Sequence, residues 1–234
     1  MLVSLLIPLH DEHDAVGPLF EDLRRLPDLL APRTLQVVCA DDGSTDDTVA
    51  RLRILAREAP FDVRVAALTP NRGLGAALRD AAPETSGDVV ITYDADRPYP
   101  LEDIPRLLAC LDAGADIATA SPWHPDGKSL GVPWHRSFIS RAISRLYRLR
   151  LGRRASNLHT ITCGFRAWRR STLLDSLPRR DGFVATAEML IRALRSGARV
   201  AEVPSVLRPR TEGRSKMRII RVAWSHLGLL LLGR

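Results

Sequence analysis

Apolar runs of strand length alternate with helix-like segments through the first half of the chain. The runs rich in Val, Ile and Leu predict buried strands at 2–8, 34–40, 62–68 and 89–92. A helix that continues to about residue 30 is predicted by four leucines at helical spacing: Leu19, Leu23, Leu26 and Leu30. A helix near 101–113 and a strand near 116–120 continue the alternation. This order predicts an α/β fold, with a mostly parallel sheet covered by helices.

The loop after the fourth strand carries the first candidate chemistry. The strand stops at Asp94-Ala95-Asp96, and Pro98 and Pro100 prevent it from continuing. In an extended run, Asp94 and Asp96 point the same way, and two like charges that close need a cation between them. Mg²⁺ or Mn²⁺, with phosphate oxygens as further ligands, meets that need. The alternative is an acidic turn without a ligand, since Asp is common in turns.

Acidic side chains gather where three of the predicted strands end. They are Asp11, Glu12, Asp41, Asp42, Asp94 and Asp96. Ligands of open parallel sheets bind outside the carboxyl ends of the strands, so we expect these carboxylates to meet in one site. Part of the loop at 41–47 has a structural explanation, because Ser44 or Thr45 can cap the next helix.

Two glycines, Gly73 and Gly75, stand between the third strand and the helix that follows it. Glycine allows a close approach of the backbone to a ligand. The segment at 71–75 lacks both the third glycine of a dinucleotide fingerprint and the GK[ST] of a P-loop, so it is weak evidence by itself.

The charge balance indicates an anionic partner. A net charge of +7 and a pI of about 10.1 suit a nucleotide, a nucleic acid or an acidic lipid. The 234 residues suffice for one large domain. Three scattered cysteines argue for a reducing compartment. Residues 2–9 lack a basic flank, so we interpret them as a core strand and not a signal peptide, and expect a cytoplasmic location.

Two segments of the second half suit a membrane surface. Residues 136–154 predict a helix that combines apolar residues with arginines, among them Arg141, Arg145, Arg148, Arg153 and Arg154, which is typical of an anionic membrane interface. The alternative is a core helix with a solvated basic face. Residues 217–234, after a domain at 1–216, are apolar over 222–232 but contain Ser225 and His226. A spanning helix needs about 20 apolar residues, so we expect this one to pack or to lie on the membrane.

Six motifs resemble those of the family-2 glycosyltransferases. In chain order they are Pro8 with Asp11-Glu12, DDGSTDDT at 41–48, NRGLGAALRDA at 71–81, DAD at 94–96, TCGFRAWRR at 162–170 and RTEGRSK at 210–216. Within that family the chain resembles the dolichyl- or polyprenyl-phosphate sugar synthases over nearly its whole length. The resemblance implies a GT-A fold, a nucleotide-sugar donor, a divalent metal (Mg²⁺ or Mn²⁺), inversion at the sugar carbon and a lipid-phosphate acceptor.

The resemblance also implies roles for individual residues. The donor-binding residues would be Pro8, His10, Glu12, Asp41, Asp94, Ala95, Asp96, Arg210 and Lys216. Asp96, with Asp94, would hold the metal. Arg210 and Lys216 would neutralise the diphosphate, so these two and Asp96 are the expected catalytic residues. Arg136 and Ser140, one helical turn apart, would contact the acceptor phosphate, although Arg136 can also be one more arginine on a basic face.

This sequence departs from the family pattern at three places. His10 replaces the usual Tyr. Pro98 stands where the family has a metal-ligating Gln, so water, Asp94 or diphosphate oxygens would complete the metal shell. Ser121-Pro122-Trp123 replaces Ser-Arg-Tyr, which removes an arginine expected near the acceptor phosphate.

We therefore expect a peripheral-membrane glycosyltransferase, on the cytoplasmic face, that moves a sugar from a nucleotide diphosphate to a polyprenyl phosphate. A phosphate is already an anion at neutral pH, so the reaction needs no general base. A transferase with a hydroxyl acceptor would need a carboxylate base, for which Glu188 or Asp181 are the candidates. A non-catalytic module that binds nucleic acid is disfavoured, because the acidic strand ends would repel phosphates.

Overall fold

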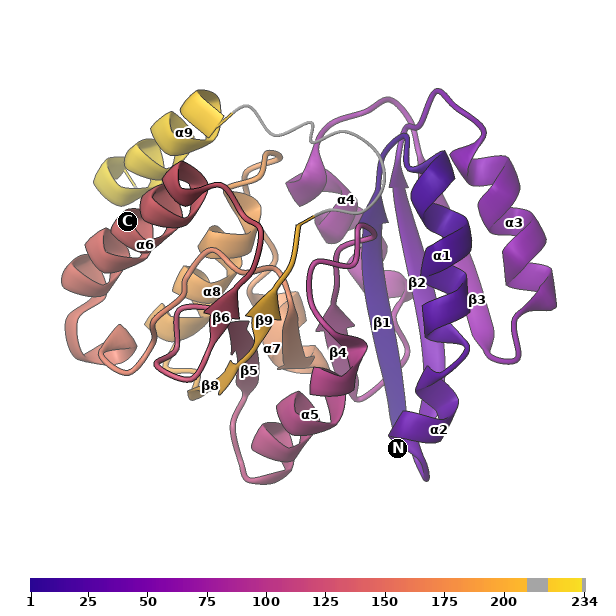
Figure 1. The fold of residues 1–234 in the computed structure, drawn as a ribbon, viewed down its shortest axis with the longest axis horizontal. Helices are drawn as coiled ribbons and strands as arrows, with labels where there is room; N and C mark the ends of the chain where they lie inside the picture. The colour runs from indigo at the N-terminus through magenta and orange to yellow at the C-terminus, as the bar shows by residue number, and fades with distance from the viewer. Residues whose placement is uncertain (210–218, 233–234) are drawn as a thin grey trace.

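A seven-stranded sheet of order β3-β2-β1-β4-β7-β5-β8 forms the centre of the computed structural model, which describes residues 1–209 and 219–232 (Figure 1). The strands are β1 (Leu2–Leu9), β2 (Thr34–Asp42), β3 (Asp62–Leu68), β4 (Val89–Thr92), β5 (Ile117–Ser121), β7 (Arg166–Arg169) and β8 (Val200–Pro204). All neighbours pair in parallel except β7, which is antiparallel to both β4 and β5. The predicted α/β class is thus confirmed. A second, two-stranded sheet pairs β6 (Lys128–Ser129) with β9 (Val206–Leu207).

Helices cover both faces of the sheet. One face packs against α1 (His13–Leu23), α2 (Leu26–Leu30), α3 (Thr48–Glu58) and α5 (Ile104–Asp112). The other packs against α4 (Leu74–Ala81), α6 (Trp134–Leu151), α7 (Arg170–Asp175), α8 (Ala185–Arg195) and α9 (Ile219–Leu232). Short 3₁₀ turns lie at Ala82–Glu84, Leu101–Asp103 and Gly152–Ala155. On β1, Leu5 and Ile7 belong to the first core and Leu6 to the second, as the alternation of a strand requires.

The first predicted helix is interrupted. Its four leucines are all buried as expected, but α1 ends at Leu23 and α2 begins at Leu26. Pro27 supplies the reason, because proline has no N–H to donate and its ring clashes with the carbonyl four residues earlier, that of Leu23.

The sheet changes direction next to β1. From β1 the chain builds β2 and then β3 on one side, whereas β4 pairs with the opposite edge of β1. Such a switch point leaves a crevice at the carboxyl ends of the two central strands. The carboxyl ends of β2, β1 and β4 therefore lie side by side, as expected from the acidic residues that follow these strands.

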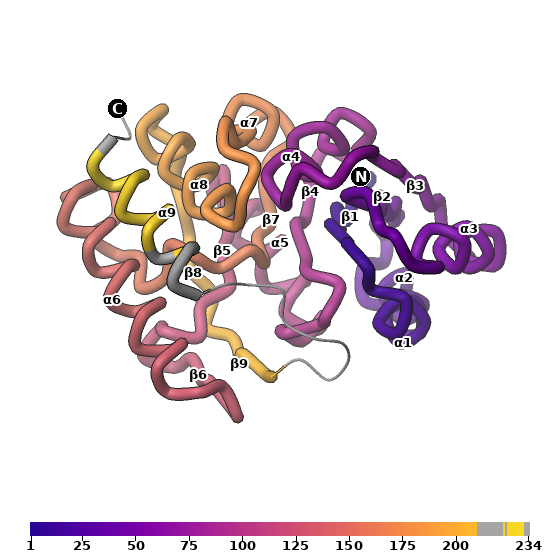
Figure 2. The backbone as a smooth tube through the Cα atoms, turned by 90° about the horizontal axis from the view of Figure 1, so that it is seen from above, coloured from indigo at the N-terminus to yellow at the C-terminus, as the bar shows by residue number. Residues whose placement is uncertain are grey.

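Two helices from distant parts of the sequence, α6 and α9, lie side by side at one end of the molecule (Figures 1 and 2). The Tyr147 hydroxyl joins them, 3.0 Å from Nδ1 of the buried His226. Helix α6 covers most of the segment predicted at 136–154 and ends at Leu151, just before Gly152, where φ is 58°. Within the described residues no helix has the length and apolarity needed to cross a membrane.

Candidate active site

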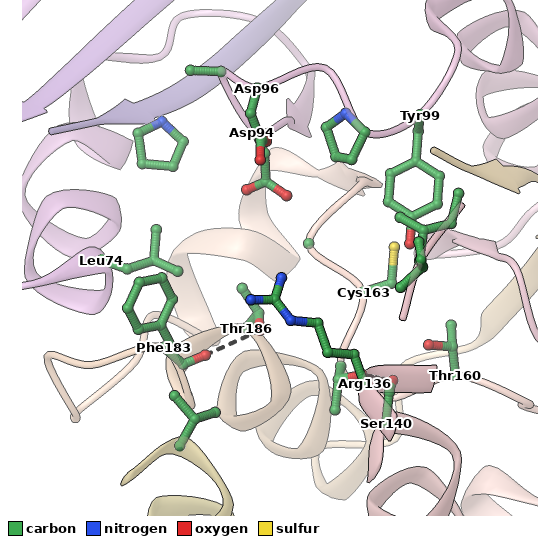
Figure 3. Close-up of a pocket in the computed structure, with 18 of the residues that line it drawn as sticks. Leu74, Asp94, Asp96, Tyr99, Arg136, Ser140, Thr160, Cys163, Phe183 and Thr186 are labelled. Atoms are coloured by element: carbon green, nitrogen blue, oxygen red, sulfur yellow. Dashed lines mark hydrogen bonds between the residues drawn. The ribbon is translucent and has the colours of Figure 1, made fainter. Parts of the chain in front are cut away.

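A cavity of about 650 Å³ opens at the carboxyl ends of β1, β2 and β4 (Figure 3). Its opposite wall comes from α6, from the segment at 160–164 and from the start of α8. Leu207 to Pro209 and, from α9, Val222 and His226 also line the cavity. Residues that are far apart in the sequence thus form one site.

Most of the predicted site residues that the structure describes line this cavity. They are Pro8, His10, Glu12, Asp94, Ala95, Asp96, Arg136 and Ser140. Asp41 does not, and its place in the lining is taken by Asp42. Arg210 and Lys216 lie outside the described residues.

The two aspartates of the second strand hold loops in place. The buried Asp41 carboxylate accepts the Ser44 N–H at 3.0 Å and the Ser44 hydroxyl. Asp42 accepts the N–H groups of Arg72 at 3.0 Å and Gly73 at 2.6 Å. Neither Ser44 nor Thr45 is therefore the predicted helix cap: α3 begins after Asp47, without a side-chain cap. The nucleoside contact expected of Asp41 remains a prediction.

The glycines at 73 and 75 leave room for a neighbouring segment of the protein, and the approach of a ligand expected there remains a prediction. A Cβ on Gly75 would overlap the Arg180 carbonyl oxygen, and one on Gly73 would lie 2.5 Å from the Asp181 carbonyl oxygen. The Gly75 N–H donates to that Asp181 carbonyl at 2.6 Å. The N-terminus of α4 is thus occupied by the segment at 180–182, although Gly73 also borders the cavity.

A tight turn holds the paired carboxylates. The Arg97 N–H donates to the Asp94 carbonyl at 3.1 Å, and Arg97 has a φ of 53°, which is unusual for a non-glycine residue. The Arg97 guanidinium pairs with Asp22 of α1 at 2.8 Å. The expected extended geometry is therefore wrong, but Asp94 and Asp96 both project into the same part of the cavity (Figure 3).

A buried cation lies behind Asp94. Arg166, at the start of β7, is 1% exposed and lines with Asp94 a narrow gap below the cavity. Its guanidinium donates to the carbonyls of Ile161 at 2.7 Å and Thr186 at 2.5 Å. Burial lowers the pKa of Arg166 to about 10, so the group is still protonated at neutral pH. Its charge partly offsets that of the Asp94 carboxylate.

The wall opposite the carboxylates carries a cation and hydroxyl groups. Arg136 extends from α6 into the cavity towards the Asp94 side (Figure 3). Its guanidinium has no hydrogen-bond or ion-pair partner among residues 1–209 and 219–232. The Ser140 hydroxyl accepts the Trp123 indole N–H at 3.1 Å and lies 2.9 Å from the Thr162 hydroxyl. The Arg141 guanidinium lies 4.6 Å from the Trp123 ring centre, so Trp123 is held on two sides.

The candidate bases do not line the cavity. Glu188 is buried in the first turn of α8, where its carboxylate accepts the Arg180 N–H at 3.0 Å. Asp181 pairs with Arg79 at 2.6 Å. Cys163 does line the cavity, but burial raises the pKa of its thiol to about 11, so it is protonated at neutral pH.

The residues present fit a divalent ion that a diphosphate helps to hold. No group of three or more His, Cys, Asp or Glu in the described part of the chain could hold a metal by itself. Asp94 and Asp96 offer the hard oxygen ligands that Mg²⁺ prefers. Mg²⁺ commonly uses one or two carboxylates, with water and substrate phosphates as its other ligands.

Several cavity residues were not predicted from the sequence: Thr160, Thr162, Phe183, Thr186 and Arg208. Thr162 begins the motif at 162–170, and Arg208 lies two residues before the motif at 210–216. Thr160 and Phe183 come from loops without a periodic pattern, and Thr186 comes from the first turn of α8, so only the assembled fold places them here.

The chain is similar to known proteins over most of its length. The model of glycosyl transferase family 2 matches residues 4–177. The polyprenol monophosphomannose synthase of Mycolicibacterium smegmatis is 35% identical over 189 residues, which cover 78% of this chain and 70% of that protein. The undecaprenyl-phosphate mannosyltransferase of Micrococcus luteus is 36% identical, with coverage of 93% and 88%. The dolichol-phosphate mannosyltransferase of Pyrococcus furiosus is 31% identical, and the match covers 93% of this chain but 60% of that protein.

Solved structures support the fold. The glucosyl-3-phosphoglycerate synthase of Mycobacterium tuberculosis, crystallised with Mn²⁺, uridine diphosphate and glucosyl-3-phosphoglycerate, superposes with a TM-score of 0.71. The match covers 99% of this chain and 79% of that one at 22% sequence identity. The expected GT-A fold is confirmed.

Proposed function

The chain belongs to glycosyl transferase family 2, and from that membership we propose that it transfers a sugar from a nucleotide diphosphate to a polyprenyl phosphate. It is a glycosyltransferase. The observation that carries the proposal is a cavity with paired carboxylates, Asp94 and Asp96, on one wall and the Arg136 guanidinium extending from the other (Figure 3). Relatives that act on polyprenol, dolichol and undecaprenyl phosphates, by their names, support the acceptor class.

The donor lies on the side of the strand ends. Pro8, His10 and Glu12 line the cavity at the strand ends and would contact the nucleoside there, and Asp94 and Asp96 would hold a divalent ion. When bound, the ion neutralises charge on the leaving diphosphate. Arg210 and Lys216 remain predicted partners of that diphosphate.

The acceptor phosphate approaches from α6. One of its oxygens attacks the anomeric carbon while the bond from that carbon to the diphosphate breaks, which inverts the sugar centre and releases the nucleoside diphosphate. No proton has to move, in agreement with the absence of Glu188 and Asp181 from the cavity lining. Arg136 then acts by positioning the phosphate, with Ser140 at the next turn of α6.

A membrane surface brings the lipid to this wall. Helices α6 and α9 expose large apolar side chains: Trp134, Phe138, Leu146, Leu149, Trp224, Leu227 and Leu231. Arginines of α6, among them Arg145 and Arg150, are exposed on the same helix. The apolar part of the cavity is lined by Ile139 and Ile143 of α6 and Val222 of α9. This combination suits an anionic lipid interface.

The activity is tested in two steps. A set of nucleotide sugars is first screened for thermal stabilisation that depends on Mg²⁺ or Mn²⁺. The stabilising donor is then assayed with polyprenyl phosphate and with free polyprenol. We expect turnover with the phosphate only. Equal turnover with the alcohol would overturn the proposed acceptor.

The membrane association has its own test. The protein should sediment with anionic vesicles and be released at 1 M salt, where the Debye length falls to about 3 Å. Trp134→Ala together with Phe138→Ala should reduce sedimentation, whereas Ile54→Ala, on the exposed face of α3, serves as a control. Equal recovery from anionic and neutral vesicles would contradict the proposal.

A further inference from the structure

The charges that line the cavity are unequally distributed. Four acidic residues line it: Glu12, Asp42, Asp94 and Asp96. Among the described lining residues the cationic side chains are those of Arg136 and Arg208. Both proposed substrates carry phosphate groups, so each of these arginines matters for binding. Arg136 belongs to the α6 wall, and the position of Arg208 decides which phosphate it meets.

Arg208 is tied to the loop of the paired carboxylates. Its N–H donates to the Pro98 carbonyl at 2.8 Å, and Pro98 is two residues beyond Asp96. The strand before it, β9, is held by β6, where the Leu130 N–H donates to the Leu207 carbonyl at 2.8 Å. The backbone of Arg208 therefore has a fixed place on the rim beside the Asp94–Asp96 turn.

The side chain of Arg208 differs from those of other arginines near the site. Arg166 donates to backbone carbonyls, and Arg97 pairs with Asp22. Arg208 is exposed at the cavity, and within residues 1–209 and 219–232 its guanidinium has no hydrogen-bond or ion-pair partner. A fixed backbone and a guanidinium without a partner among the described residues are the arrangement expected of a ligand-binding arginine.

We propose that Arg208 binds the diphosphate of the nucleotide-sugar donor, on the rim next to Asp94 and Asp96. This inference rests on the proposed function. Pro98 offers no side-chain metal ligand, and the guanidinium adds positive charge at that position. An arginine donates two parallel N–H groups to phosphate oxygens, so it shares with the divalent ion the neutralisation of the diphosphate.

The test is the calorimetric binding of UDP and GDP, each measured in EDTA and in saturating Mg²⁺. Arg208→Ala should weaken the better of the two by about 10- to 100-fold in EDTA, the range expected for a charge-assisted contact. The loss should be smaller in Mg²⁺, and the Mg²⁺ concentration for half-maximal binding should rise. The binding of UMP and GMP, which lack the second phosphate, should be weakened less by Arg208→Ala than the binding of UDP and GDP.

Two variants serve as controls for this measurement. Arg208→Lys keeps the charge and should recover part of the affinity, which a merely structural defect would not do. Arg53→Ala, at an exposed position of α3, should change nothing.

The possible failures are distinguishable. If wild-type protein binds neither UDP nor GDP in Mg²⁺, the proposed function itself fails. If it binds one of them and Arg208→Ala binds it equally well in EDTA, the inference is overturned while the function stands. If Arg208→Ala leaves nucleotide affinity intact but raises the KM for polyprenyl phosphate, Arg208 contacts the acceptor and the inference is likewise overturned.

Discussion

The two walls of the cavity are built in opposite ways. The donor wall consists of the ends of β1, β2 and β4 and their loops, and its chemistry is carboxylate. Its aspartates are fixed by hydrogen bonds: the Asp42 carboxylate accepts two backbone N–H groups, and the Asp94 carbonyl accepts the N–H that closes a turn. The acceptor wall is a half-exposed helix, α6, with arginines and hydroxyl groups, and α9 packs against it.

The two walls therefore have different tasks: one binds the diphosphate and the ion, and the other admits the lipid. A diphosphate and an ion need ligands fixed within fractions of an ångström, which strand ends in a packed sheet provide. A long lipid needs an open apolar surface, which an amphipathic helix at the edge of the molecule provides. Variants of the donor wall should therefore change nucleotide and metal binding. Variants of the acceptor wall should change turnover while nucleotide affinity stays constant.

The largest effect should come from the donor wall, in Asp96→Asn. The substitution removes one of the two carboxylates proposed to hold the ion, so turnover should fall below detection. Nucleotide binding should also lose its dependence on Mg²⁺. Calorimetry with and without the ion, beside a donor-turnover assay, measures both. If metal dependence persists unchanged, Asp96 is not a ligand.

On the acceptor wall, Arg136→Ala should slow transfer to polyprenyl phosphate by about one to two orders of magnitude. The reason is the loss of a charge-assisted contact worth roughly 1.5–3 kcal/mol. Nucleotide affinity should stay nearly constant. Steady-state kinetics with a short-chain polyprenyl phosphate, which avoids effects of membrane binding, provides the measurement.

Arg145→Ala is the matched control for that variant. Arg145 is an exposed arginine of the same helix, but it does not line the cavity. If it slows transfer as much as Arg136→Ala does, the effect comes from the overall charge of α6. A large loss of nucleotide affinity in Arg136→Ala would instead place that arginine on the donor side.

The donor wall was also the more predictable one. Periodic apolar runs locate β1, β2, β3 and β4, and a parallel sheet brings their carboxyl ends together, so Glu12, Asp94 and Asp96 could be predicted from the strands themselves, whereas His10 was predicted from the family resemblance. The features of this wall that depend on local contacts were less predictable. The sequence does not reveal that the Asp41 carboxylate is occupied by Ser44, or that Gly75 faces the Arg180 carbonyl.

The acceptor wall depended more on contacts distant in sequence. The antiparallel strand β7 was missed, because its four residues, Arg166–Arg169, include two arginines and have no clear period. Arg166 is nonetheless buried, since backbone carbonyls from two other segments satisfy its guanidinium. Thr160 and Phe183 reach the cavity only through loops, which carry no periodic signal.

A smaller effect concerns the attachment of α9 to the acceptor wall. Burial lowers the pKa of His226 to about 4, against about 6.5 in the unfolded chain. Between these values the unfolded state takes up a proton that the folded state does not, so stability falls as the pH falls. The free energy of unfolding should drop by about 2 kcal/mol from pH 7 to pH 5 through this group.

Urea titrations of wild type and His226→Gln at both pH values isolate that contribution from the other acids. The variant should lose the part of the pH dependence that His226 causes, while the remainder stays the same. Identical pH dependence in the two proteins would mean that His226 is accessible to protons in the folded state.

The smallest expected effect, in Glu188→Gln, distinguishes most sharply between the acceptor classes. The Glu188 carboxylate accepts the Arg180 N–H and lies outside the cavity lining, and a glutamine oxygen can accept the same bond. Loss of its charge from the first turn of α8 should cost about 0.3–1 kcal/mol of stability. Turnover with polyprenyl phosphate should stay within about twofold of wild type, because a phosphate nucleophile gives up no proton. A general base contributes about 10²–10⁴ to a rate. A fall of that size would therefore mean that Glu188 reaches the acceptor during turnover and that the acceptor attacks through a hydroxyl group.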